Sequence, residues 1–190
     1  MNRKTPSPLL KGAVAAGVAL LGMKAYVAAK AARSTLATID KLDVARYMGT
    51  WYEIARFPNR FERKCAGDTT ATYTALPDGS VKVENRCRRH DGGSELAQAI
   101  AHQVGGPDSP KLRVRFAPAA LSFIPLVWGD YWIVDLDPAY SLAAVSEPGR
   151  DYLWILSRTP RVEQDRYEAL LARLAAQGLE VDRLQLTPQA

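Results

Sequence analysis

Few side chains in this sequence have the types and spacing that catalysis or metal binding requires. The two histidines, His90 and His102, do not follow a metal-ligand spacing, and no G-x-S-x-G, phosphate-binding glycine loop or H-E-x-x-H motif is present. Asp135 and Asp137 fit the carboxylate pair of a glycosidase poorly. We therefore expect no catalytic residue, no metal site and no cofactor.

Cys65 and Cys87 are the only cysteines, and they are candidates for a covalent link. An even count in an exported domain favours a disulfide, which here closes a loop of about 22 residues and contributes on the order of 3 kcal/mol. Simple hairpin pairing around Asp78 and Gly79 does not place the two cysteines opposite each other, so the disulfide requires a bulge or a curved loop. The alternative is an inward-facing thiol, which enzyme chemistry would need in an acidic, accessible form.

The charge of the chain is concentrated at its N-terminus. The 190 residues are 47% hydrophobic and carry a net charge of +5. Six of the 25 basic residues lie in residues 1–33, which contain no acidic residue, so 19 basic and 20 acidic residues remain in residues 34–190. A nucleic-acid-binding domain needs a basic face on its folded part. The sequence therefore argues against nucleic acid as a partner.

Residues 1–33 have the pattern of an N-terminal signal or membrane-anchor segment. A positive stretch, Met1–Lys11, precedes the small and apolar run Gly12–Met23, which is shorter than the roughly 20 residues that span a bilayer. This pattern predicts an export signal, with an uncleaved anchor and a cytoplasmic helix as alternatives. No cysteine follows the apolar run, so we expect no lipid-modified N-terminus. The predicted location is the periplasm or the membranes of the cell envelope.

Short β-forming runs at similar spacing dominate the chain after residue 40. Leu76–Ser80 is a turn, because Pro77 fixes φ and Gly79 accepts a positive φ. A short helical turn is expected over residues 43–49. The pattern predicts eight strands, at residues 51–57, 69–75, 80–87, 97–104, 111–116, 131–136, 141–146 and 152–157.

One amphipathic helix is predicted between Pro160 and Gly178, where apolar residues recur at helical spacing. Eight strands followed by a single helix do not fit a sandwich. They favour an all-β fold, an eight-stranded antiparallel up-and-down β-barrel (a calyx) with the C-terminal α-helix packed outside.

Three ordered motifs resemble those of the lipocalin family, and the longer runs around the first and third are especially similar to bacterial lipocalins. They begin with G-x-W at Gly49–Trp51 and continue with Asp135-Leu136-Asp137 before Tyr140. The third is Leu156–Pro160, which is built around Arg158. The resemblance implies a lipocalin domain over residues 40–188. It also implies that Gly49, Trp51, Asp135, Asp137 and Arg158 are structural, with the guanidinium of Arg158 lying over the indole of Trp51.

The resemblance also implies an apolar ligand inside the barrel. Side chains alternate along a strand, so Trp51 sets the parity that turns Glu53 and Ala55 inward. A buried Glu53 would need hydrogen-bond partners or a raised pKa. In the alternative interpretation, some of the inward-facing residues pack a filled core and do not line a ligand cavity. By matching the lipocalin pattern, the other expected inward residues are Ala71, Tyr73, Val81, Val83, Asn85, Leu112, Val114, Phe116, Tyr131, Ile133, Tyr152 and Trp154.

Three functions are compatible with this sequence. The favoured one is a non-enzymatic carrier or store of fatty acids, lysophospholipids or similar apolar ligands. The second is a thiol-dependent isomerase on the same fold. The third is an interaction module with a filled barrel, whose apolar stretch Leu121–Trp128 binds a partner. That stretch is also compatible with a barrel rim, a membrane surface contact, a homodimer contact or a buried strand extension.

Overall fold

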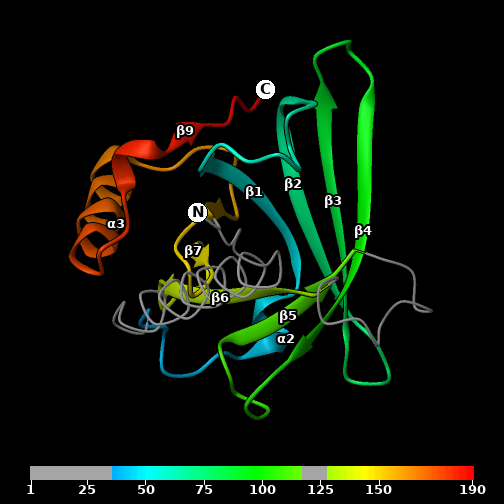
Figure 1. Ribbon diagram of the computed structural model, residues 1–190, viewed down its shortest axis with the longest axis vertical. Coiled ribbons are helices and arrows are strands. Elements are labelled where there is room, and N and C mark those ends of the chain that lie inside the picture. The colour runs from blue at the N-terminus through cyan, green and yellow to red at the C-terminus, as the bar shows by residue number, and fades with distance from the viewer. Residues whose placement is uncertain (1–35, 117–127) are drawn as a thin grey trace, which may run out of the picture. The chain divides into compact units, whose positions relative to one another are not determined.

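The computed structural model describes residues 36–116 and 128–190, and its main feature is an antiparallel barrel (Figure 1). Consecutive strands pair with one another in an up-and-down order. The strands are β1 (Gly49–Arg56), β2 (Cys65–Ala75), β3 (Val81–Arg89), β4 (Ser94–Gln103), β5 (Lys111–Arg115), β6 (Trp128–Leu136), β7 (Leu142–Ser146) and β8 (Leu153–Ser157). The predicted eight-stranded fold is confirmed.

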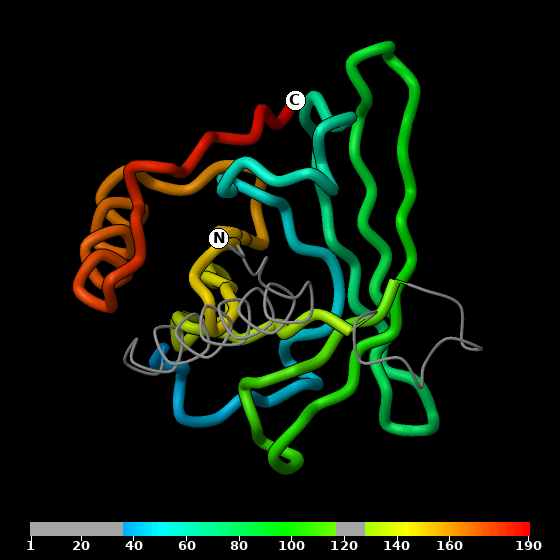
Figure 2. Tube along the Cα trace, viewed as in Figure 1, coloured from blue at the N-terminus to red at the C-terminus, as the bar shows by residue number. Residues whose placement is uncertain are grey.

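The barrel closes through β1, which pairs with strands on both of its sides. Tyr52 lies opposite Thr70 of β2 and also opposite Ser157 of β8. A short ninth strand, β9 (Gln185–Leu186), adds to β1 farther along, with Leu186 opposite Ala55. The C-terminal segment then continues past β1 to the start of β2 (Figure 2), where the amide of Asp68 donates to the Pro188 carbonyl at 2.8 Å.

The two ends of the barrel differ in what covers them. A short helix, α2 (Val44–Tyr47), precedes β1, and its Tyr47 packs into the barrel interior. We call this the α2 end. The opposite end carries the loop between β1 and β2 and the Cys65–Cys87 disulfide, and we call it the disulfide end.

Helix α3 (Gln164–Ala176) lies on the outside of the barrel (Figure 1). Leu170 and Leu174 are fully buried, and they pack with outward-facing residues of β7 and β8 such as Leu142 and Ile155. The helix ends before Gly178, whose φ of 78° favours glycine. A single turn of 3-10 helix, η3 (Val181–Arg183), leads to β9.

Side-chain alternation divides the buried apolar residues into an interior cluster and an outer cluster. The interior cluster includes Trp51, Val83 and Val145, whereas the outer cluster joins α3 to the outer face of the sheet. All five residues of β7 are buried, because one face meets the barrel interior and the other meets α3. The barrel interior is therefore a separate compartment from the helix interface.

Two predictions lie outside the described residues. They concern the leader at residues 1–33 and nearly all of the apolar stretch Leu121–Trp128, of which only Trp128 is described, as the first residue of β6. Among the helices of residues 36–116 and 128–190, none combines the length and the apolar content needed to cross a membrane.

Candidate functional site

The α2 end is held together by Trp51 and Arg158. The guanidinium carbon of Arg158 lies 4.0 Å from the Trp51 ring centroid, and the indole nitrogen donates to the Tyr47 carbonyl at 2.8 Å. Arg158 also donates to the backbone carbonyls of Thr50 and Met48 at 2.9 and 2.8 Å. These contacts satisfy carbonyl groups around the short helix, so Arg158 is structural here.

Gly49 allows this close approach. Its φ is 93°, a conformation that other residues rarely adopt, and a Cβ atom there would lie 3.3 Å from an Arg158 nitrogen. A side chain at this position would therefore strain the backbone and displace Arg158.

Three tyrosines meet inside the barrel at the α2 end, and we call Tyr47, Tyr73 and Tyr131 the phenol cluster. The Tyr131 hydroxyl lies 2.7 Å from that of Tyr73 and 3.1 Å from that of Tyr47. Burial raises the pKa of Tyr73 to about 12 and raises the pKa values of Tyr47 and Tyr131 well above their ordinary value. The three phenols are therefore neutral groups that donate hydrogen bonds.

One wall of the interior consists of small side chains. The strand register places Ala71, Asn85 and Ala97 in one row across β2, β3 and β4, and Ala99 and Ala101 continue inward along β4. Asn85 breaks this apolar wall. Within the described residues its Oδ1 atom is buried and has no hydrogen-bond partner, which is a costly arrangement for a polar atom. This wall presents little side-chain volume and one unused acceptor.

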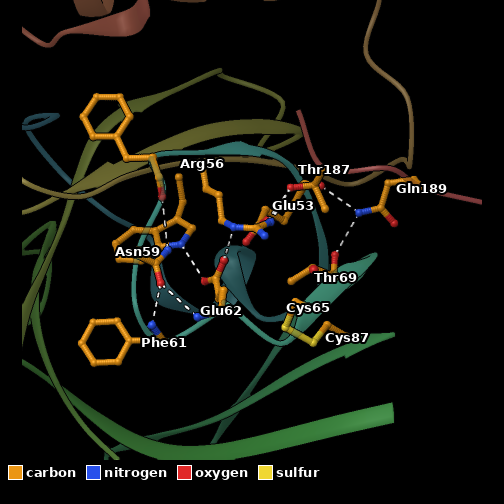
Figure 3. A network of polar contacts seen from close by, with 12 residues as sticks. Glu53, Arg56, Asn59, Phe61, Glu62, Cys65, Thr69, Cys87, Thr187 and Gln189 are labelled. Atoms are coloured by element: carbon orange, nitrogen blue, oxygen red, sulfur yellow. Dashed lines mark hydrogen bonds and ion pairs between the residues drawn. A yellow bond between two sulfur atoms is a disulfide. The ribbon is translucent and has the colours of Figure 1, made fainter. Parts of the chain in front are cut away.

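A network of charged groups lies at the disulfide end (Figure 3). Arg56 donates to the carboxylate of Glu53 and forms an ion pair with Glu62, whose Oε2 atom lies 2.7 Å from the Arg56 Nε. The other oxygen of Glu62 accepts from the indole of Trp154 at 2.9 Å. Thr187, near the C-terminus, donates to Glu53. The guanidinium of Arg56 is thus shared between two carboxylates, those of Glu53 and Glu62.

Glu53 is the buried member of this network, with only 3% of its surface exposed. Burial, together with the nearby charge of Glu62, raises the pKa of the Glu53 carboxyl to about 7, against the opposing effects of Arg56 and Thr187. The protonation of Glu53 therefore changes near neutral pH. An additional anion next to this carboxyl would be disfavoured whenever Glu53 is ionised.

The disulfide joins Cys65 at the start of β2 to Cys87 of β3, with a Cα–Cα distance of 5.6 Å. Two register shifts in β2, on either side of Gly67, bring the cysteines together. This is the bulge that simple hairpin pairing requires. Both thiols of the chain are consumed in the bond, so a thiol-dependent isomerase would have no free thiolate.

Most residues expected to face inward lie in or against the interior cluster. Asn85 lies in the same row as Ala71, and Tyr152 lies just before β8 with its ring stacked 5.7 Å from that of Trp154. The other residues expected to face inward belong to the interior cluster or pack against it. Those that are buried are Ala71, Tyr73, Val81, Val83, Leu112, Val114 and Ile133, and those that are half-buried are Tyr131 and Trp154.

Two of the expected inward residues lie elsewhere. Ala55 is buried in the outer cluster with the residues that contact α3. A register shift in β1 between Glu53 and Ala55 reverses the alternation, and Arg56 contacts Glu53 in its place. Phe116 is 56% exposed, because β5 ends at Arg115 and the alternation does not extend to it.

The residues that sequence reasoning missed are those brought in by irregular structure. Arg56 depends on the β1 bulge, Glu62 lies in a loop, and Thr187 follows the short β9. Nothing in their spacing indicates that they meet. The sequence does contain a signal for Tyr47, because it lies one helical turn before Trp51. Its carbonyl accepts a hydrogen bond from the Trp51 indole.

The aspartates of the second motif connect the barrel to α3. Asp135 accepts two hydrogen bonds from Arg173, at 2.7 and 2.9 Å. Asp137 accepts from the amide of Leu142 at 2.9 Å and from Arg166 at 3.1 Å. Both carboxylates are occupied by structural partners. In residues 36–116 and 128–190, no group of three His, Cys, Asp or Glu side chains is arranged to hold a metal ion.

Comparison with known proteins agrees with this architecture. The family described as a lipocalin-like domain matches residues 42–189. The chain is 41% identical to temperature-induced lipocalin-1 of Arabidopsis thaliana over 160 residues, which cover 83% of this chain and 85% of the relative. It is 38% identical to the outer membrane lipoprotein Blc of Escherichia coli K12, with 76% and 78% of the two chains covered.

A solved structure shows the same fold at low sequence identity. Insecticyanin from the tobacco hornworm Manduca sexta superposes with a TM-score of 0.64 and 16% identity, and the match covers 83% of this chain and 86% of that one. Together, the closed barrel, the Trp51–Arg158 pair and these matches show that the chain belongs to the lipocalin family and is of the Blc type.

Proposed function

We propose that this lipocalin binds a lipid, such as a fatty acid or a lysophospholipid, inside its barrel and carries or stores it without chemical change. As a member of the lipocalin family, it is a protein that binds a small hydrophobic ligand. The observation that carries the more specific proposal is the alanine wall of β4, where Ala99 and Ala101 are buried beside Val83 and Val81 and Ala97, on the same face beside Asn85, is exposed nearer the disulfide end. An acyl chain placed there would gain about 0.8 kcal/mol per buried methylene.

The charged network supports an amphiphile over a pure hydrocarbon. Glu53, Arg56 and Glu62 lie at the disulfide end, where they can meet a polar headgroup, and an anionic headgroup fits there only while Glu53 is protonated. The unused Oδ1 atom of Asn85 lies between that network and the phenol cluster in the order of the strand register. Polar groups of this kind orient a ligand in an otherwise apolar site.

The test is a titration of the delipidated protein with a fluorescent fatty-acid probe. Ala97→Trp places a large ring on the inward side of β4, whereas Gln98→Trp places the same ring on the outward side, where Gln98 contacts Glu84. We expect the first variant to lose most of the binding and the second to keep the affinity of the parent. Equal binding by both variants, or no binding by the parent, would contradict the proposal.

We also propose that the protein acts in the cell envelope, in contact with a membrane surface. The signal-like pattern of residues 1–33 and the likeness to an outer membrane lipoprotein support the location. Phe61, which is 64% exposed in a loop with Arg60 and Arg63, is suited to contact an anionic membrane. Expression of the full chain in a Gram-negative host tests this. Recovery from the envelope fraction is expected, and recovery of the unprocessed chain from the cytosol would contradict it.

A further inference from the structure

The phenol cluster has one more hydrogen-bond donor than it uses. Its three hydroxyls supply three hydrogens, and the two bonds between them use two. In the described part of the chain, none of the three hydroxyls has a further partner. One phenolic hydrogen is therefore left over, whichever way the chain of hydroxyls points.

The leftover hydrogen lies where an unpaired donor is unfavourable. Tyr47 and Tyr73 are 3% and 6% exposed, and their neighbours in the interior cluster are apolar, including Trp51 and Leu112. A buried hydroxyl without an acceptor is destabilising. All three phenols keep their hydrogens at neutral pH, since the ordinary pKa of tyrosine is about 10 and burial raises the pKa of each phenol further. The cluster thus presents a permanent donor to the interior.

The chemistry of the cluster restricts what satisfies it. An alcohol that joined the chain of hydroxyls would accept the spare hydrogen but bring another of its own. A carboxylate would carry a charge into an apolar site, where burial outweighs the attraction of the nearby Arg158 guanidinium, as the raised pKa values of Tyr47 and Tyr73 indicate. A carbonyl oxygen accepts the hydrogen, brings none and carries no charge.

We propose that the phenol cluster donates its spare hydrogen to an uncharged carbonyl oxygen on the end of the ligand that enters the barrel first. This subsite rests on the proposed function, since it requires an apolar ligand in the interior. It adds a selection rule to that function: of two apolar chains of the same length, the one with a ketone, aldehyde or ester carbonyl on the end that enters first binds more tightly than the one whose leading end is hydrocarbon.

The experiment compares a long-chain methyl ketone, the alcohol and the alkane of equal chain length as competitors of a bound fluorescent probe on the full chain. We expect the ketone to bind about tenfold more tightly than the alkane, which is the effect of one net hydrogen bond, and the alcohol to lie between them. The infrared carbonyl stretch of the bound ketone should lie below its frequency in hydrocarbon solvent. This infrared measurement needs only the wild-type protein.

The triple variant Tyr47→Phe, Tyr73→Phe, Tyr131→Phe removes all three hydroxyls and keeps the rings. It should bind ketone and alkane equally and return the carbonyl stretch to the hydrocarbon frequency. Tyr167→Phe, on the outer helix, is the matched control and should behave as wild type. Equal binding of ketone and alkane by the wild type, with an unshifted stretch, overturns the subsite and leaves the proposed function standing. Failure of every ligand to bind overturns both.

Discussion

Glu53 combines a charged side chain with a buried position, and this combination makes it sensitive to pH. It shares the cation of Arg56 with Glu62, so the pair of carboxylates is only partly neutralised. The folded protein favours the protonated form of Glu53, with a pKa of about 7 against an ordinary value of 4.5. Stability and headgroup binding at this end should therefore both depend on pH.

Glu53→Gln should remove this dependence. Between about pH 4.5 and 7 the folded wild type holds a proton that the unfolded chain has released, so its free energy of unfolding falls as the pH rises through this window. Relative to wild type, the variant should gain on the order of 2 kcal/mol between pH 5 and pH 8, measured by urea unfolding. Glu84→Gln is the control, because the pKa of Glu84 is lowered by its contacts with Gln98 and Lys82. Parallel pH profiles for wild type and Glu53→Gln would rule the effect out.

At the scale of elements, the sequence predicts the regular strands and the outer helix, but it does not predict the bulges that interrupt the strands. The eight strands and α3 follow from the periodicity of apolar residues and from turn residues such as Pro77 and Gly79. The periodicity does not reveal the bulge in β1, because Ile54, Ala55 and Phe57 are all apolar and suit either face of the strand. The assignment of Ala55 was therefore wrong, and the Arg56 network was missed.

The disulfide fastens the elements at one end of the barrel. Replacing both cysteines, Cys65→Ser with Cys87→Ser, frees the irregular part of β2 from β3, where the register shifts already interrupt the ladder. Loss of about 3 kcal/mol in the free energy of unfolding is expected from the chain entropy of the open loop. Urea unfolding of the variant measures this, and wild type in a reductant should give the same midpoint. An unchanged midpoint in both would show that the bond does not contribute.

Helix α3 stabilises the barrel from outside and should not affect the ligand. Leu170 is fully buried in the outer cluster, so Leu170→Ala should cost about 3 kcal/mol while the affinity for a fatty-acid probe stays the same. Leu171→Ala is the control, since Leu171 is only half-buried and should lose less. A large fall in affinity from Leu170→Ala in still-folded protein would show that the two compartments are coupled.

For the whole molecule, the two ends of the barrel offer different chemistry to a single ligand. The α2 end holds phenolic donors beneath a structural Trp51–Arg158 pair, and the disulfide end holds two carboxylates and one guanidinium. The family could be identified from the sequence motifs, because Gly49, Trp51 and Arg158 lie in those motifs and together build the α2 end of the barrel. Strand alternation and the resemblance also predicted the polar residues Glu53, Tyr73, Asn85 and Tyr131 of the interior. The partners of Glu53 could not be predicted, because Arg56, Glu62 and Thr187 lie in a bulge, a loop and the C-terminal segment that meet only in the fold.

The central claim is that the interior of this barrel binds a lipid, and native mass spectrometry tests it most directly. The full chain, purified without detergent, is weighed under non-denaturing and then denaturing conditions. The proposal predicts an added mass, matching a fatty acid or lysophospholipid, that disappears on denaturation. It also predicts reduced occupancy in Ala97→Trp and normal occupancy in Gln98→Trp. A protein that carries no added mass, and gains none after challenge with these lipids, would contradict the proposal.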